Sequence, residues 1–346
     1  MSIIVRSIDV GYGNTKFVVA ESEGEYIYDC FESSAVVADL EGSSADYNVV
    51  RVPVSDKYYF VGHDSYLVSN AHSVKPLHEN YIETEEYMAL MKGVLKMMNI
   101  PLIDVLVIGL PVRLYRSRYA LLKNLWKGNI YLGDDKYVQI RNVHVTIQPM
   151  GAYMDYRNYA QSTRNDNFTG RTLLVDPGWQ TLDWMTVEGL NPIVDSTDSN
   201  TFGINGMLCK VARTIVDGST SELPFPSSPL LTEVDSWIRS GEISLFGGKF
   251  VTPVAPYMKP GLDYVDKAIE SMFGSLSQRH AIQEVVLSGG AATIYRQATE
   301  KSFPHHSIVI PADPVYANVR GYQQIGLEAV RKYESGKNSD ARNQHG

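Results

Sequence analysis

A chain of 346 residues with 44% hydrophobic and 20% charged residues is long enough for two domains of ordinary globular composition. A formal net charge of -8 argues against direct nucleic-acid binding through a broad basic face. The two cysteines, Cys30 and Cys209, are too few for a disulfide framework and fit a cytoplasmic protein, and no apolar run approaches the roughly 20 residues that cross a membrane.

The first half of the chain opens with three apolar, β-branched runs, which predict an antiparallel start. Residues 32 to 82 are irregular, polar and tyrosine-rich, and predict a small inserted subdomain. Thr84 precedes apolar residues at helical spacing and predicts a capped helix. The expected elements are strands over 3–10, 16–20, 25–31, 104–111 and 137–147, and helices over 85–98, 115–126 and 151–161.

The succession of apolar strands and helices then begins again, which predicts a second domain. Its expected elements are strands over 172–176, 181–187 and 284–287, and helices over 205–216, 230–239, 261–276 and 314–333. We expect domains over 1–160 and 161–333, with inserted subdomains at about 32–82 and 218–280, the last helix packing back on the first domain, and a disordered tail over 334–346.

One motif occurs once in each half. IDVGYGNTKF, residues 8–17, and VDPGWQTLDW, residues 175–184, both place Asp-x-Gly at the end of an apolar strand and a threonine at the head of the next. Either copy alone is explained as a structural hairpin whose aspartate caps a turn. Two copies at corresponding places favour a duplicated domain, with two hairpins that face each other across a cleft.

The residues of this pair suit a nucleotide polyphosphate. Gly11, Gly13 and Gly178 allow close approach, so that backbone N–H groups can contact phosphate oxygens. Lys16 adds a positive charge. Asp9 and Asp176, at strand ends, could hold Mg²⁺ through its water shell, because Mg²⁺ keeps several waters and takes few carboxylates.

A third motif follows the strand at 284–287. The sequence Ser288-Gly289-Gly290-Ala291 leads into a helix, and its glycines let a base or ribose lie against the backbone at the helix N-terminus. It matches neither a Walker A sequence nor a Rossmann fingerprint. Alone, this motif is an ordinary strand–helix turn. Together with the two hairpins it gives, in chain order, two candidate phosphate-binding motifs followed by a candidate nucleoside-binding motif.

This ordered set of motifs resembles the actin, Hsp70 and sugar-kinase ATPase superfamily over about residues 3–332. The form Asp-x-Gly-x-Gly-Asn-Thr-Lys is most similar to the bacterial and archaeal actin-like proteins of the ParM type, which segregate plasmids. The resemblance implies an α/β fold of duplicated actin-like (ribonuclease H-like) domains, each a mixed sheet flanked by helices, with a nucleotide cleft between them. Two connecting segments complete the set, 148–152 and 315–321.

The resemblance also implies the site residues. Gln148 positions the attacking water, and Asp9 and Asp176 orient the hydrated Mg²⁺; a neutral amide cannot remove a proton, so hydrolysis should be slow. Tyr12 departs from the family, which often has a small hydroxyl residue there. The implied contacts to ATP, with GTP left open, are Gly11, Tyr12, Gly13, Asn14, Thr15, Lys16, Gly178, Trp179, Gln180, Thr181, Gly203, Asn205, Gly289, Gly290 and Ala291.

The function expected from the resemblance is a cytoplasmic ATPase that polymerises head-to-tail and segregates a plasmid through a DNA-binding adaptor of the ParR type. Two alternatives stay open: a small-molecule kinase of the same superfamily, acting on a sugar or an acid, and a nucleotide-dependent scaffold with little hydrolysis. Asp183 and Trp184, beside the second hairpin turn, are better interpreted as structural. His63 is expected to be a solvated loop residue.

Overall fold

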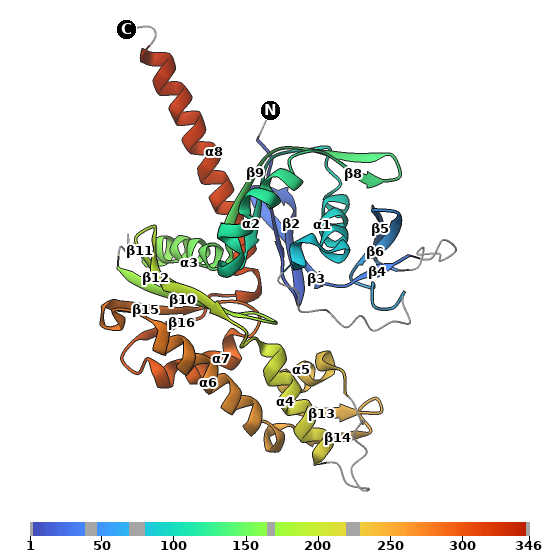
Figure 1. Cartoon of the computed structure of the whole chain (residues 1–346), viewed down its shortest axis with the longest axis vertical. Helices are drawn as coiled ribbons and strands as arrows, with labels where there is room; N and C mark the ends of the chain where they lie inside the picture. Colours follow the sequence, from blue (N-terminus) through green and yellow to red (C-terminus); the bar gives the residue numbers. More distant parts are fainter. Residues whose placement is uncertain (1–2, 39–46, 69–79, 165–169, 219–228, 344–346) are drawn as a thin grey trace. The chain divides into compact units, whose positions relative to one another are not determined.

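A computed structural model describes residues 3–38, 47–68, 80–164, 170–218 and 229–343 of the chain (Figure 1). Residues 39–46 and 69–79 of the first predicted insertion, 219–228 of the second, and 344–346 of the predicted tail lie outside this description. The chain divides into two compact units, Met1–Thr169 with Pro311–Gly346, and Gly170–Ile310. The first unit is therefore built from both ends of the sequence.

A six-stranded mixed sheet forms the centre of the first unit. Its strand order is β3-β2-β1-β7-β9-β8, with β1 antiparallel to β2 and parallel to β7. The strands are β1 (Val5–Val10), β2 (Asn14–Ser22), β3 (Glu25–Glu32), β7 (Leu102–Leu110), β8 (Gly128–Gly133) and β9 (Lys136–Ile147). All six residues of β1 are buried, as expected of a strand covered on both faces.

Helices cover both faces of this sheet. On one face, α1 packs Leu90 and Leu95 into the cluster that contains Ile8 and Ile108. On the other face, α8 lies so close that a Cβ atom at Gly326 would be 2.5 Å from the Val5 side chain. The helical elements are η1 (Tyr81–Glu83), α1 (Glu85–Met98), α2 (Val112–Leu125), α3 (Gln148–Arg164), η4 (Pro314–Tyr316) and α8 (Ala317–Asn343).

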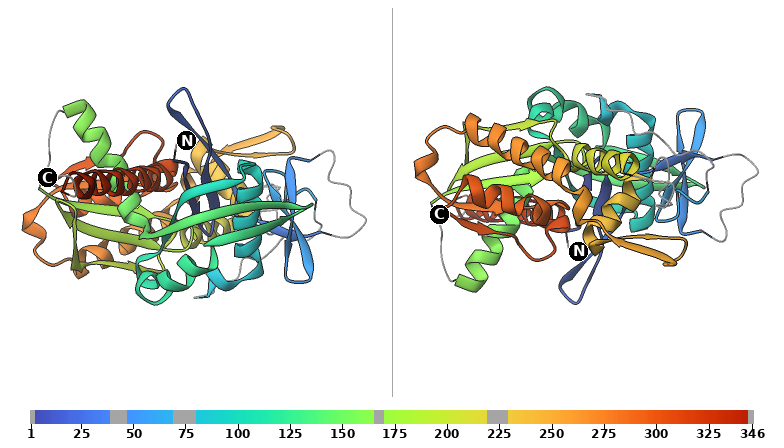
Figure 2. Two further views of the ribbon diagram at one scale, coloured as in Figure 1. Left: turned by 90° about the horizontal axis from the view of Figure 1, so that it is seen from above. Right: turned by 90° about the horizontal axis from the view of Figure 1, so that it is seen from below.

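A small three-stranded sheet belongs to the same unit and stands apart from the larger sheet (Figures 1 and 2). It consists of β4 (Ala35–Val37), β5 (Val49–Val54) and β6 (Lys57–Gly62), in the order β4-β6-β5. Helix α1 joins it to the main core, because Gly93 lets Val61 approach to a distance that a Cβ atom would not allow. These strands lie within the predicted insertion at 32–82.

The second unit repeats the topology of the first. Its sheet has the order β12-β11-β10-β15-β16, and β10 is antiparallel to β11 and parallel to β15, as β1 is to β2 and β7. The strands are β10 (Arg171–Pro177), β11 (Leu182–Glu188), β12 (Asn191–Asn200), β15 (Ile282–Leu287) and β16 (Ser307–Val309). The predicted fold class, duplicated mixed sheets flanked by helices, is confirmed.

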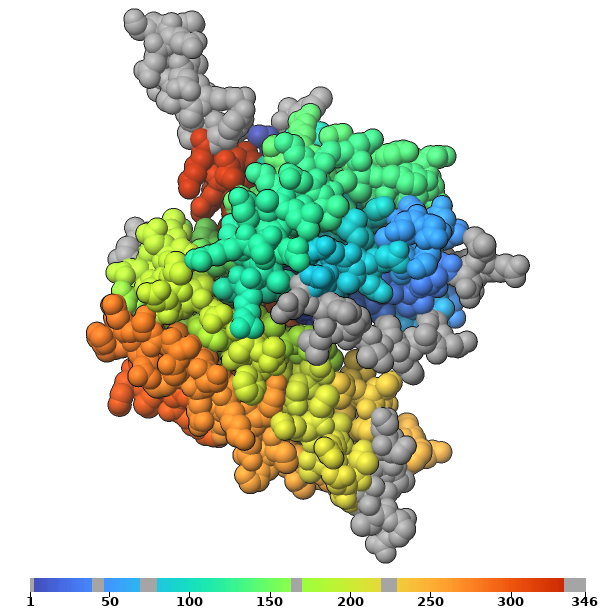
Figure 3. All heavy atoms as spheres, in the orientation of Figure 1, coloured from blue at the N-terminus to red at the C-terminus, as the bar shows by residue number. Residues whose placement is uncertain are grey.

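The helices of the second unit share one hydrophobic core with its sheet, in which Val175 and Val285 lie among Met207, Val265 and Tyr295. Much of α6 lies at the surface of this unit, where it is drawn in orange (Figure 3). The remaining elements are α4 (Ile204–Asp217), α5 (Leu231–Ser240), β13 (Glu242–Leu245), β14 (Phe250–Pro253), η2 (Ala255–Tyr257), α6 (Lys259–Ser275), η3 (Arg279–Ala281) and α7 (Ala292–Ser302).

The structure differs from the sequence-based expectation at the C-terminus. Helix α8 continues to Asn343, whereas the sequence predicts a helix that ends at residue 333 and a disordered tail from residue 334. A helix needs no apolar anchor to keep its backbone hydrogen bonds, since these are made within the segment. No helix among the described residues has the length and apolar character that a membrane crossing requires.

Candidate functional site

The first predicted phosphate loop is the turn between β1 and β2. The Gly11 amide donates to the carbonyl of Asn14 at 3.1 Å, which closes the turn. Ser33 holds it from outside: its hydroxyl donates to the carbonyl of Gly11 at 2.6 Å, and its amide donates to the carbonyl of Gly13 at 2.8 Å. The buried Thr15 hydroxyl lies 2.8 Å from the same Ser33 oxygen. Thr15 thus supports the loop conformation, and Ser33 is a supporting residue that no sequence pattern singles out.

Two predicted site residues of the first unit, Lys16 and Gln148, contact a third, Asp9. The Lys16 ammonium lies 3.1 Å from one oxygen of Asp9, and the Gln148 amide donates to the other oxygen at 3.2 Å. Asp9 is 1% exposed, so this carboxylate is almost removed from water and both of its oxygens have donors. Gln148 reaches it from 139 positions away because it begins α3 directly after β9.

Tyr12, the residue that departs from the family pattern, turns its ring to the protein. The ring stacks on that of Tyr81, with centroids 4.5 Å apart and an interplanar angle of 23°. Tyr81 in turn meets Tyr87 edge-on at 5.5 Å. Burial raises the pKa of the Tyr81 phenol, so this ring stays neutral. The phenol of Tyr12 therefore stiffens the loop by aromatic contact.

The second predicted phosphate loop, between β10 and β11, is joined to the N-terminus of α4. The Gly178 amide donates to the carbonyl of Thr181 at 2.8 Å, and the Gly178 carbonyl accepts from Ile204 at 2.9 Å. Gly203 must lack a side chain, because a Cβ atom there would be 2.4 Å from the carbonyl oxygen of Trp179. Gly203, one of the implied nucleotide contacts, thus lies directly against the loop.

The side chains of this second loop have partners within the unit. The Thr181 hydroxyl donates to Asp183 at 2.5 Å, so the carboxylate of Asp183 orients a loop residue. The amide of Asn205 donates to the buried Gln180 side chain at 3.4 Å. Trp179 is half-buried and packs against the core of the second unit. These contacts account for the conformation of the loop.

The third predicted loop, 288–291, lies against Asp176. Gly289 has a φ of +78°, and a Cβ atom there would be 2.2 Å from an oxygen of Asp176, so both backbone conformation and space require glycine. The Ser288 amide continues the pairing with β10 by donating to Val175 at 2.9 Å. Ala291 is the N-cap of α7. The predicted metal ligand and nucleoside loop of the second unit are therefore neighbours.

The two predicted connecting segments cross in the first unit. Gly151 of α3 and Gly321 of α8 are in backbone contact, since a Cβ atom at Gly321 would be 1.8 Å from the Gly151 carbonyl oxygen. Two polar contacts flank the crossing. Asn318 accepts from the amide of Ala152 at 3.1 Å, and Arg320 forms a two-pronged ion pair with Asp155 at 2.8 and 2.7 Å.

Other titratable groups lie outside these loops. His63 is paired with Asp29 at 3.0 Å, so it is not simply the solvated residue that we expected. Burial raises the pKa of the Cys30 thiol, which is paired with Lys16 in the β2–β3 register, while the charge of Lys16 lowers it. Within the described residues, no three histidine, cysteine, aspartate or glutamate side chains gather as a metal site.

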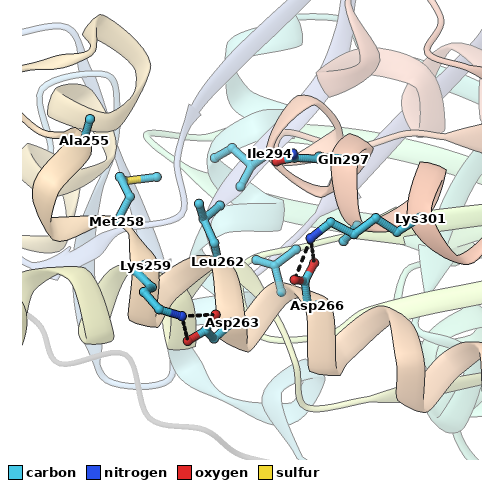
Figure 4. Close-up of a pocket in the computed structure, with 11 residues that line it drawn as sticks. Ala255, Met258, Lys259, Leu262, Asp263, Asp266, Ile294, Gln297 and Lys301 are labelled. Carbon is cyan, nitrogen blue, oxygen red and sulfur yellow. Dashed lines mark hydrogen bonds and ion pairs between the residues drawn. The ribbon is translucent and has the colours of Figure 1, made fainter.

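The second unit also has a surface groove (Figure 4). It has a volume of about 330 Å³ and lies between α6 and α7, with Leu262 and Ile294 among its lining residues. Its charged groups neutralise each other in pairs, because Lys259 is bonded to Asp263 and Lys301 to Asp266. None of the predicted site residues lines it. The groove therefore offers no unpaired charge for a phosphate.

Comparisons with known proteins agree with this architecture. Residues 7–151 match the family model of the actin-like proteins N-terminal domain. The archaeal actin homologue Ta0583 has a TM-score of 0.74 at 19% identity and covers 94% of this chain and 100% of its own, and it has also been solved in complex with ADP. No curated protein matches the chain by sequence.

Two further solved structures have the same fold. The apo form of the psk41 ParM protein has a TM-score of 0.68 at 14% identity, with 96% of this chain and 100% of that chain covered. A subunit of a 15-stranded ParM filament from Clostridium botulinum has a TM-score of 0.70 at 17% identity, with 95% and 100% covered. Identities this low establish a common fold, and the chemistry must be argued from the residues.

Proposed function

From a chain with the actin-like fold, whose residues 7–151 match the N-terminal domain of actin-like proteins, we propose a cytoplasmic ATPase that binds Mg-ATP and assembles into filaments. The observation that carries this proposal is the meeting of Lys16 and Gln148 at the buried Asp9. A cation, an amide and a carboxylate at a glycine turn are the groups that phosphate positioning and a hydrated Mg²⁺ require.

Each half of the proposed site contributes a turn and a carboxylate. The first supplies Asp9 with the turn at Gly11 and Gly13, and the second supplies Asp176 with the turn at Gly178. Two carboxylates at strand ends fit Mg²⁺, which keeps most of its waters in protein sites. The metal would neutralise phosphate charge. Lys16 would contact the terminal phosphates and Gln148 would orient water. The complex of Ta0583 with ADP supports a nucleotide at this fold.

Filament assembly is proposed from the relatives that share this fold. A ParM filament and a filament of another actin-like protein are among these structures. A head-to-tail contact that does not close on itself makes an open filament. The net charge of -8 favours attachment to plasmid DNA through a separate adaptor of the ParR type rather than directly.

Nucleotide binding is tested by titration calorimetry with ATP and ADP in the presence of Mg²⁺. We expect binding by the wild-type chain and at least a tenfold loss of ATP affinity in Lys16→Ala, since a charge-assisted contact is removed. The matched control is Lys259→Ala, which removes a cation from an exposed ion pair with Asp263. Equal affinities in all three proteins would rule out Lys16 as a phosphate ligand.

Assembly is tested by light scattering and electron microscopy with Mg-ATP, Mg-ADP and no nucleotide. We expect filaments with Mg-ATP, and their loss in Lys16→Ala but not in Lys259→Ala. A protein that binds ATP yet stays monomeric at high concentration would refute the filament proposal. If that protein also transfers phosphate to a member of a sugar and acid panel, the kinase alternative replaces it. Filaments that persist without turnover would favour the scaffold alternative.

A further inference from the structure

The hairpin of β13 and β14 in the second unit presents an aromatic ring to solvent at its apex. Among the described residues these two strands pair only with each other, and Leu245 and Phe250 are the last pair before the turn. Phe246, the first residue of the turn, is 64% exposed, the highest value among the large hydrophobic residues that the structure describes. Its ring therefore contributes little to the core of the unit.

The backbone that carries this ring is unfavourable for an aromatic residue. Phe246 has a φ of +53°, and Gly247 and Gly248 after it have φ values of +67° and +85°. The Gly248 amide donates to the carbonyl of Leu245 at 3.1 Å, which closes the turn. Left-handed turn positions usually hold glycine, asparagine or aspartate, because a larger side chain is strained there. The fold of the hairpin gives no reason for phenylalanine, so contact with another molecule explains it better.

The groove between α6 and α7 of the same unit suits an uncharged ring. Met258, Leu262 and Ile294 are among its lining residues, and its volume of about 330 Å³ has room for an aromatic side chain. The lysines and aspartates at its rim are bonded to each other in pairs (Figure 4). None of residues 246–249 lines it. The apex of the hairpin therefore lies outside the groove of its own chain.

We propose that the ring of Phe246 inserts into the groove between α6 and α7 of a second copy of this chain. This inference rests on the proposed function and names one contact of the filament. Insertion would also cover Leu262, which is 37% exposed, so both copies would bury apolar surface. A protrusion and a groove at different places on one chain join copies head-to-tail, which is the kind of contact that makes an open filament.

A second copy is the occupant that the observations favour. A small apolar ligand accounts for the groove but leaves the exposed, strained ring of Phe246 unexplained. A different protein accounts for the ring or for the groove, whereas a second copy of the chain accounts for both. The paired charges at the rim agree with an apolar side chain rather than a charged ligand.

The first experiment replaces the ring by glycine, which adopts a positive φ without strain. Phe246→Gly should keep the ATP affinity of wild type and a urea midpoint at or above that of wild type. Its critical concentration for assembly with Mg-ATP, measured by pelleting, should rise about tenfold or more, because an aromatic anchor of the contact is lost. Leu190→Gly is the matched control. It removes an exposed apolar side chain from the turn between β11 and β12 and should assemble as wild type does.

The second experiment changes the groove. Leu262→Glu places a charge in its apolar lining, and docking of a ring would bury that charge without a partner. This variant should form no filaments at the concentrations at which wild type does. The matched control is Ser271→Glu, which adds the same charge at an exposed position of α6 that does not line the groove, and it should assemble as wild type does.

The third experiment tests whether the apex and the groove of different copies meet. Lys249→Cys, at the apex, is combined with Lys301→Cys, at the rim of the groove, so that the ring and the apolar lining are unchanged. A short thiol–thiol cross-linker added with Mg-ATP should give a ladder of covalent multimers on a denaturing gel. Each single variant, which retains the native Cys30 and Cys209, should give no such ladder.

The inference is overturned if Phe246→Gly assembles at the wild-type concentration. It is also overturned if the urea midpoint of this variant falls clearly below that of wild type, because the ring would then serve the fold of the hairpin. A double cysteine variant that gives no more covalent multimers than the single variants overturns it as well. A wild-type chain that forms no filaments overturns the proposed function itself, and the cross-link then still decides whether the two surfaces meet in solution.

Discussion

Tyr12 gives the first turn an aromatic support. Its ring stacks on Tyr81, which in turn contacts the buried Tyr87 of α1. Ser33 hydrogen-bonds to the backbone of the same turn. A turn held by ring packing and by backbone hydrogen bonds has little freedom to relax. Substitution of Tyr12 should therefore weaken the packing of Tyr81. The losses in the free energy of unfolding caused by the two single substitutions should not be additive.

We predict a coupling free energy of about 1 kcal/mol between Tyr12 and Tyr81 in a double-mutant cycle of alanine variants. Urea unfolding measures it. The control cycle uses Tyr115 and Tyr119, whose rings stack at 5.7 Å with Tyr119 46% exposed, and should give a coupling near zero. Equal couplings in the two cycles would mean that the Tyr12 stack is a surface contact without energetic weight.

Gln148 is expected to act on turnover rather than on affinity. Its amide is fixed on Asp9, and the loss of a positioning group of this kind lowers a rate by roughly 100-fold. Gln148→Ala should therefore hydrolyse ATP about 100-fold more slowly, with an ADP affinity within about threefold of wild type. Phosphate release and calorimetry measure the two quantities. Gln297→Ala, on the surface of α7, is the control. Unchanged turnover in Gln148→Ala would remove this residue from the mechanism.

At the scale of elements, the crossing of α3 and α8 depends on a missing side chain. A Cβ atom at Gly321 would overlap the Gly151 backbone, and backbone cannot move aside as a flexible side chain can. Gly274 near the end of α6 is the opposite case, because a Cβ atom there would have no other group within 4 Å. The structure thus requires glycine at position 321 and has room for a side chain at position 274.

We predict changes of opposite sign in the free energy of unfolding when each of these glycines is replaced by alanine. Gly321→Ala should lose about 2 kcal/mol or more, as overpacked sites do. Gly274→Ala should gain up to about 0.5–1 kcal/mol, because alanine loses less backbone entropy in a helix. Urea unfolding of both variants is the measurement. A loss in both would show that α6 does not tolerate the methyl group for a reason outside its packing.

Elements with a strong local signal could be predicted from the sequence. Thr84 accepts the hydrogen bond from Tyr87 that a helix cap requires, and β1 is as buried as its apolar run indicates. Strands β8 and β12 lie outside the predicted elements. The sequence of β12, NPIVDSTDSN, does not alternate between apolar and polar residues over most of its length. Short strands such as β16 are defined by their neighbours, which a linear pattern does not contain.

Some parts of the candidate site could be predicted from the sequence, and others could not. The Asp-x-Gly hairpins are local and are visible as a repeated motif, whereas Ser33 and Arg239 act on loops 22 and 51 positions away. The position of such residues depends on the tertiary structure, because only strand pairing and helix packing bring them to the loop. Their sequence neighbours carry no corresponding signal, and the nucleotide role of the hairpins stays a prediction.

At the scale of the whole molecule, buried and half-buried phenols such as that of Tyr28 make stability sensitive to alkaline pH. Burial raises the pKa of Tyr28 from about 10 to about 12, with Asp155 adding to the rise and Arg320 opposing it. Between these values the folded chain keeps a proton that the unfolded chain loses. The resulting stabilisation is present below pH 10 and is lost as the pH rises through 12.

We therefore predict that Tyr28→Phe loses less stability than wild type between about pH 10 and about pH 12, since it has no phenol to ionise. Urea midpoints at several pH values in this interval measure the slope for each protein. Buried tyrosines such as Tyr87 and Tyr295 also contribute to the wild-type slope, so the comparison is the difference between the two proteins. Parallel slopes would place the titration of Tyr28 at its ordinary value in the folded chain.

The construction of the first unit from both ends of the sequence has a consequence for synthesis on the ribosome. Strand β1 is made first, yet one of its faces is covered by α8, where the Ser7 hydroxyl reaches Val319 and Gly326 meets Val5. The second unit is one continuous segment and is fully translated earlier. Domains generally fold N-terminal first. In this chain, however, β1 is fully covered only after α8 has been translated. A nascent chain that stops before residue 311 would expose one apolar face of its central sheet.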